Sequence, residues 1–199
     1  NITKISESSF ENCWGLIGDL NIPQTATDLG ISAFKGCAGL NGELTIPSGI
    51  TSIPNEIFAG CRNLIGTIEI PKTVETIGFG AFSGCSSYTN LILNENVSSI
   101  GDYAFYGNTA LNSIAIRCFT PPTLTSTQTF ANTNNCPIYI PLGSLETYRS
   151  HPYWGMYGSR YVEYMVFEDK MVEEKALELY DINRDDMLFN NEISGVTSI

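Results

Sequence analysis

Residues 33–56 read AFKGCAGLNGELTIPSGITSIPNE, and close copies of this stretch precede and follow it along the chain. The phenylalanines of the copies are spaced 24, 24, 24, 23 and 25 residues apart, at Phe10, Phe34, Phe58, Phe82, Phe105 and Phe130. A period of this length is typical of stacked-repeat proteins, in which one unit cannot bury its own apolar face and its neighbours complete the core. The sequence therefore predicts a solenoid whose function lies on a surface repeated along the stack.

Within this stretch, apolar residues alternate with polar ones over a short run that contains Leu40, Leu44 and Ile46. Such alternation predicts a strand in which every second side chain points to the core. The strand should stop at Pro47, which has no N–H to donate to a ladder. Each coil is expected to contribute one short strand to a parallel sheet and to return through turns or 3₁₀ segments.

A second column follows the phenylalanines, at Cys13, Cys37, Cys61 and Cys85. Thiols stacked on successive coils lie in a line, which cannot converge tetrahedrally on zinc, and a buried thiol packs as a small hydrophobe. The fifth copy has Asn108 in this column, so we expect reduced cysteines buried in the core. Cys118 and Cys136 lie outside the column, and a disulfide between them in an oxidising compartment is an alternative.

Composition describes a folded chain of 199 residues, 43% hydrophobic and 16% charged. The net charge is −11 and no basic stripe exists, which argues against nucleic-acid binding. The acid is concentrated after residue 150, where it fits a cation site or a solvated surface. No apolar run of about 18 residues is present, so the sequence predicts no membrane span.

Catalytic motifs are missing from the sequence. The single histidine, His151, precedes Pro152 and has no nucleophile paired with it by spacing. The sequence contains no nucleophile elbow, phosphate-binding loop or zinc-protease motif. A glycosidase would need two acids facing a cleft, which a thin repeat stack does not offer. We therefore expect a protein that is not an enzyme.

The copies carry a recurring signature, seen as Ile77-Gly-Phe-Gly-Ala-Phe82-Ser-Gly-Cys85 and followed by an Ile-Pro pair. This pattern resembles the BspA-like leucine-rich repeats found in surface proteins of host-associated bacteria. The resemblance covers residues 1–140 as about six coils of 23–25 residues. It implies an α/β repeat solenoid of short parallel strands with a C-terminal cap, followed by a small helical segment. It also implies a secreted or cell-surface module that adheres to a host or extracellular-matrix protein. A carbohydrate-associated module and an architectural spacer are the alternatives.

Residues 141–160 are predicted to form the cap. Ser144 can N-cap a short helix that Pro152 ends. Four aromatic residues can cover the apolar end of the stack: Tyr148, Tyr153, Trp154 and Tyr157. The same rings could instead form a carbohydrate platform.

Residues 161–199 are predicted to hold a linker strand, a helix and a loop typical of an EF-hand. Oxygen ligands for Ca²⁺ have the required spacing, at Asp181, Asn183, Asp185, the Met187 carbonyl and Glu192. Two residues depart from the pattern: Asp186 replaces the usual glycine, and Phe189 contributes no oxygen. The alternative is a degenerate loop that links this array to another, because repeat-like text resumes after Glu192 and both ends look cut from a longer polypeptide.

The outward strand positions define the predicted partner-binding face. Early coils present carboxylates, Glu43 and Glu69, which favour a basic partner. Later coils present an apolar strip of Ile92, Ala115 and Tyr139, which is typical of a contact site. The rival interpretation is that the cap folds over this strip.

Overall fold

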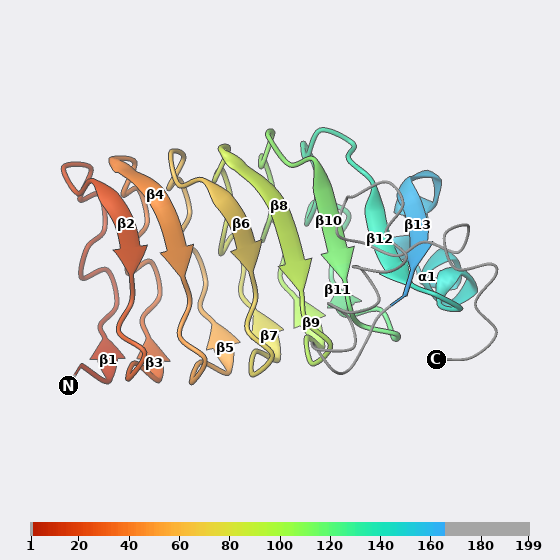
Figure 1. The fold of residues 1–199 in the computed structure, drawn as a ribbon, viewed down its shortest axis with the longest axis horizontal. Coiled ribbons are helices and arrows are strands. Elements are labelled where there is room, and N and C mark those ends of the chain that lie inside the picture. The colour runs from red at the N-terminus through yellow and green to blue at the C-terminus, as the bar shows by residue number, and fades with distance from the viewer. Residues whose placement is uncertain (1, 166–199) are drawn as a thin grey trace, which may run out of the picture.

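The computed structural model describes residues 2–165, which form an elongated solenoid of parallel strands (Figure 1). Each coil carries a longer strand on one side and, in most coils, a two-residue strand on the return side. This architecture confirms the predicted repeat solenoid.

The longer strands stand side by side along the rod: β2 (Gly18–Asn21), β4 (Leu40–Thr45), β6 (Gly66–Glu69), β8 (Tyr88–Leu93), β10 (Ser113–Ile116), β12 (Ile138–Pro141) and β13 (Tyr161–Tyr164). The short strands form a second row: β1 (Lys4–Ile5), β3 (Asp28–Leu29), β5 (Ser52–Ile53), β7 (Thr76–Ile77), β9 (Ser99–Ile100) and β11 (Thr123–Leu124). The longer row divides into the sheets β2-β4 and β13-β12-β10-β8-β6, and the short row into β1-β3 and β11-β9-β7-β5. Both rows are interrupted at the same place, between the second and third coils.

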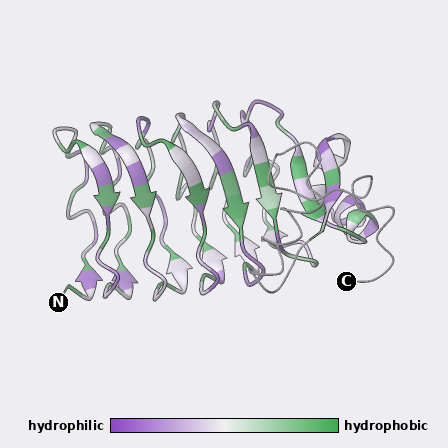
Figure 2. Cartoon of the chain, in the orientation of Figure 1, coloured by the Kyte–Doolittle hydropathy of each residue, from purple (hydrophilic) through white to green (hydrophobic). Residues whose placement is uncertain are grey.

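Strand register follows the predicted outward columns. Glu69 lies beside Ile92, Ile92 beside Ala115, and Ala115 beside Tyr139. Colouring by hydropathy shows hydrophilic positions on β2 and β4 and a more hydrophobic stretch on β8 and β10 (Figure 2).

The two predicted columns run through the core, beside the inward isoleucine and leucine side chains of the strands. The phenylalanine rings stack at centroid distances of 5.2 to 5.9 Å, from Phe10 to Phe130. Phe34, Phe58 and Phe82 are buried, whereas Phe10, in the first coil, is 39% exposed. The column therefore gains its burial from neighbouring coils, as the period predicts.

All six cysteines are free thiols. In the column, the thiols of Cys61 and Cys85 donate to the carbonyls of Phe34 and Phe58, both at 3.1 Å. The alternative bridge between Cys118 and Cys136 is not formed. Cys118 donates to the Asn94 carbonyl at 3.2 Å instead, and Cys136 lies 3.5 Å from the guanidinium of Arg160.

The cap contains helix α1 (Leu145–Ser150) and the 3₁₀ helix η1 (Trp154–Arg160). The Trp154 ring lies 5.3 Å from Phe130 and continues the aromatic column. Its indole N–H donates to the Pro122 carbonyl at 2.6 Å, and the Tyr148 hydroxyl donates to the Cys118 carbonyl at 2.7 Å. Tyr148 and Trp154 are fully buried, so they close the stack and cannot serve as a carbohydrate platform.

One detail of the cap differs from the prediction. Ser144 occupies the N-cap position, but its hydroxyl donates to the Pro141 carbonyl and makes no capping bond. The capping acceptor is Glu163 of β13, whose Oε1 accepts from the N–H groups of Gly143 at 2.8 Å and Leu145 at 3.2 Å. A carboxylate from the next strand thus replaces the serine as acceptor for the first helical N–H, that of Leu145, and it also fixes the N–H of Gly143 just before the helix.

Candidate functional site

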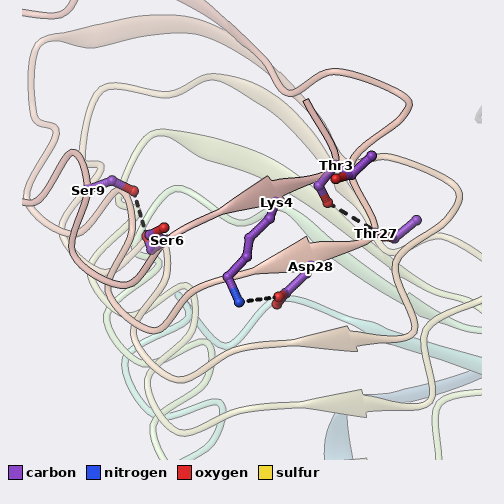
Figure 3. Close-up of polar contacts among 6 residues, drawn as sticks. All are labelled: Thr3, Lys4, Ser6, Ser9, Thr27 and Asp28. Carbon is purple, nitrogen blue, oxygen red and sulfur yellow. Dashed lines mark hydrogen bonds and ion pairs between the residues drawn. The ribbon is translucent and has the colours of Figure 1, made fainter. Parts of the chain in front are cut away.

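The interface between the first two coils shows how adjacent coils normally join. Lys4 and Asp28 form an ion pair at 2.6 Å across β1 and β3, and the N–H of Thr27 donates to the Thr3 carbonyl at 2.9 Å (Figure 3). Among the described residues, no equivalent ladder joins β3 to β5. We call this interruption between coils 2 and 3 the seam.

Pro54 accounts for the seam on the return side. In three other coils the residue after the short strand is a glycine whose N–H donates to the preceding coil at 2.8 Å: Gly30, Gly78 and Gly101. Pro54 takes this place in the third coil and has no N–H. It also adds a ring where space is short, since a Cβ placed on Gly78 would lie 2.6 Å from the backbone nitrogen of Asn55. Pro54 therefore removes one of the backbone bonds that join other pairs of coils.

The longer strands separate at the same level. The N–H of Ile65 donates to the Gly42 carbonyl at 3.0 Å, but within residues 2–165 no ladder continues from there between β4 and β6. The Phe34 and Phe58 rings across the seam are 5.9 Å apart, the widest spacing in the aromatic column. The seam therefore runs through the core as well as through both sheets.

A groove of about 770 Å³ opens where β4 and β6 separate. Its walls include Glu43 and Leu44 from β4 and Glu69 from β6, and Lys72 and Arg117 lie toward the carboxyl ends of the strands. Leu44 occupies an inward strand position but is only half-buried. The groove therefore exposes apolar surface between charged groups. We call this the seam groove.

Glu43 and Glu69 are exposed, and neither forms an ion pair with another residue of the described range 2–165. The Asp19 carboxylate accepts from the backbone N–H of Glu43 at 2.9 Å, which fixes this part of β4. Lys72 is already paired, with its Nζ 3.3 Å from the carboxylate of Glu95. The groove thus presents two carboxylates that have no ion-pair partner within residues 2–165, beside the cationic side chains of Lys72 and Arg117.

The predicted apolar strip is only partly correct. Ile92 and Tyr139 are half-buried, but Ala115 is 5% exposed, so the expectation of three accessible residues is wrong at Ala115. Its methyl group lies between the larger side chains of its two register partners. The Tyr164 ring of β13 contacts Tyr139 edge to face at 6.4 Å and adds further cover. The rival interpretation placed the cap over this strip, yet the Trp154 ring packs inside the stack.

The predicted calcium ligands Asp181, Asn183, Asp185, Met187 and Glu192 lie outside the described residues. Within residues 2–165, no group of three or more His, Cys, Asp or Glu side chains could hold a metal ion. No helix in that range is long and apolar enough to cross a membrane.

His151 has a structural role, since its Nδ1 accepts from the backbone N–H groups of Tyr153 and Trp154 at 3.3 and 3.4 Å.

Sequence reasoning identified Glu43 and Glu69 but missed the groove between them. Leu44, Lys72 and Arg117 were not singled out, because nothing in a single copy shows that two coils separate. The available signal was Pro54, at a position that is glycine in neighbouring copies.

Comparison with known proteins supports the repeat assignment. Residues 3–137 match the family described as BspA type Leucine rich repeat region, in six copies. No curated protein matches the chain.

Solved structures that are similar to it include two leucine-rich repeat proteins. A leucine rich cell surface protein from Faecalibacterium prausnitzii A2-165 is 31% identical, with a TM-score of 0.52 over 58% of this chain and 30% of that protein. A leucine-rich repeat protein from Bacteroides ovatus ATCC 8483 is 23% identical, with a TM-score of 0.53 over 70% of this chain and 43% of that protein, and shows the fold alone. The chain spans less than half the length of either protein.

Proposed function

Because the chain belongs to the BspA-type leucine-rich repeat family, we propose that it is a non-enzymatic module of a bacterial cell-surface protein that binds another protein through the seam groove. The surface location is supported by the similar structure from Faecalibacterium prausnitzii, which is described as a cell surface protein. Adhesion to a basic host or extracellular-matrix protein is the form of binding that we propose.

The observation that carries this proposal is the seam groove with its two unpaired carboxylates. Strand backbones hold Glu43 and Glu69 on opposite walls, so the backbone of the site needs little ordering when a partner binds. The half-buried Leu44 between them offers apolar contact, which contributes affinity when water is displaced. The carboxylates favour lysine or arginine from the partner and accelerate its approach at low salt.

The test measures binding of candidate host and matrix proteins by surface plasmon resonance, with a glycan array in parallel. We compare the parent chain with the Glu43→Gln/Glu69→Gln double variant. Glu7→Gln/Glu11→Gln is the matched control, because it removes the same charge from the return side of the first coil. We expect a basic protein to bind the parent chain, and the Glu43→Gln/Glu69→Gln variant to bind it about tenfold or more weakly. This difference in affinity should grow as the salt concentration is lowered.

Equal loss in both double variants would show a general charge effect and contradict binding in the groove. Binding of glycans without proteins would favour the carbohydrate-associated alternative. Absence of binding in both the protein screen and the glycan array would favour an architectural spacer.

A further inference from the structure

Three aromatic side chains form a cluster on the return side of coils 4 and 5, outside the longer strands. The Phe79 ring contacts Tyr103 at 5.7 Å and 62°, and Tyr103 contacts Tyr106 at 5.5 Å and 64°. Phe79 is 47% exposed and Tyr103 38% exposed, and Tyr106 is half-buried. We call these three residues the aromatic ridge.

The repeat itself does not require these rings. The position of Tyr103 is Ser8, Ser32, Glu56 or Gly80 in the preceding coils. The position of Tyr106 is Glu11, Lys35, Ala59 or Ser83 in those coils. Small or charged residues serve both positions in a coil of the same shape, so packing of the stack does not explain the ridge.

The backbone at Tyr103 argues in the same direction. Its φ is 58°, in the left-handed region, as is that of Gly80 at 57°. Glycine adopts this conformation freely, whereas a bulky aromatic residue is disfavoured there. The preceding coils have the same positive φ, at Ser8, Ser32 and Glu56, so the conformation belongs to the repeat and only the bulky ring is particular to this coil. Tyr103 therefore supplies an exposed ring at a local conformational cost.

The charges around the ridge indicate what it would bind. Asp102 precedes Tyr103, and its carboxylate accepts from the Thr125 hydroxyl on the next coil. The Glu56 side chain reaches toward the ridge from the other direction, since a Cβ on Gly80 would lie 3.5 Å from its Cγ. Lys35 is already paired with Glu56 at 2.8 Å. Because Lys35 neutralises Glu56, Asp102 is the carboxylate that gives the exposed rings a negative neighbour, and rings beside a carboxylate favour a cation.

We propose that the aromatic ridge binds an arginine side chain of a partner polypeptide. The guanidinium stacks on the exposed ring faces, and the Asp102 carboxylate supplies the opposite charge. Arginine fits better than lysine, because its planar guanidinium is weakly hydrated and stacks on aromatic faces. This surface is distinct from the seam groove and does not rest on it.

The test uses two fluorescein-labelled peptides, Gly-Arg-Gly-Arg-Gly and the same sequence with citrulline, an uncharged analogue of arginine of nearly equal shape. Anisotropy titrations are run at physiological ionic strength with the Glu43→Gln/Glu69→Gln protein, so that the seam groove cannot supply the signal. We expect the arginine peptide to bind at least about fivefold more tightly than the citrulline peptide.

Two ridge variants use residues that other coils carry at the same positions. Tyr103→Gly matches Gly80, and Phe79→Asn matches Asn55. Each variant should bind the arginine peptide at least about fivefold more weakly. Tyr103→Gly should unfold at the parent's temperature or above, because glycine accepts the positive φ. The matched control is Ser8→Gly, at the same left-handed position in the first coil with φ 51°, and it should bind as the parent does.

Equal affinity for the two peptides would overturn the proposal, as would undiminished binding by both ridge variants or no binding by the parent. Binding of a neutral oligosaccharide that both ridge variants lose, without a preference for arginine, would assign the ridge to glycans instead and also overturn it.

Discussion

At the level of single residues, the buried thiols combine packing with a weak hydrogen bond. Cys61 and Cys85 are fully buried, and each thiol proton meets a phenylalanine carbonyl of the preceding coil. Burial raises the pKa of Cys61 to about 12 and that of Cys85 well above its ordinary value of 9.0, because a thiolate would lose its hydration there. The stack therefore keeps these cysteines neutral and unreactive.

These pKa shifts predict a loss of stability in alkali. Below pH 9.0 both the folded and the unfolded thiols are protonated, so their contribution is fully present. Between pH 9.0 and about 12 the unfolded Cys61 ionises and the folded one does not, so the free energy of unfolding falls as pH rises. Urea unfolding under reducing conditions at about pH 8 and about pH 10 measures this fall. Cys61→Ala should show a smaller fall, and an identical fall would contradict the assignment.

The aromatic column predicts a large effect of truncation. Phe58→Ala should lower the free energy of unfolding by about 3–5 kcal/mol, because the ring is fully buried between two neighbours. Phe10→Ala is the control, since this ring is 39% exposed and has one ring neighbour in the column. Urea denaturation gives both values. Equal losses would show that burial in the column does not set the stability.

The residues of the core could be predicted from the sequence, because a strict period fixes which side chains face inward. Exposure on the outer face could not be predicted as well. Ala115 occupies an outward position, yet its small side chain is covered by Ile92 and Tyr139. Pattern gives the direction of a side chain, whereas its accessible area depends on the sizes of its neighbours.

At the level of elements, we expect the seam to depend on Pro54. Pro54→Gly should supply the missing N–H to the Leu29 carbonyl and remove the ring that separates coils 2 and 3. We expect the seam groove to narrow and Leu44 to become less exposed. Hydrogen–deuterium exchange should show new protection at residues 53–55.

Pro23→Gly is the control for general effects of replacing a proline in this chain. It lies in the first coil, away from the seam, and should leave exchange at residues 53–55 unchanged. If Pro54→Gly left that exchange as fast as in the parent, another residue would be responsible for the separation.

The calcium site remains a sequence-based prediction at this scale. If residues 181–192 bind Ca²⁺, their oxygen ligands should surround one ion at about 2.3–2.6 Å. Titration calorimetry of the chain should then give calcium heat that Glu192→Gln abolishes and Glu174→Gln preserves. Absence of heat in the parent would leave the alternative of a linking loop.

The order of the elements was predictable, but some of the contacts that join them were not. The cap was expected from its aromatic residues, and Trp154 does continue the phenylalanine column. The helix cap supplied by Glu163 was not expected, since it comes from a strand that follows the helix. The seam was missed for the same physical reason, because both features arise between segments that are regular when taken alone.

At the level of the whole molecule, the solenoid consists of two regular stacks joined at the seam. On the return side the junction keeps its backbone bonds, for example from Phe34 N–H to the Ile57 carbonyl at 2.9 Å and from Gly36 N–H to the Ala59 carbonyl at 2.7 Å. The strand ladders on either side of these bonds are interrupted. The sequence predicts the rod and the outward columns, while the proposed binding groove depends on the irregularity between them.

The seam is also the place where we expect the rod to bend most easily. Bending a stack of laddered coils strains every ladder, so deformation concentrates where the ladders are already broken, and the row of turn bonds acts as its hinge. The width of the seam groove and the curvature of the rod should then change together. A pull along the rod would open the groove, and a partner wedged into it would stiffen the rod. Stretching single molecules in an optical trap should therefore show a softer elastic response for the parent than for Pro54→Gly, and equal stiffness would rule out a hinge at the seam.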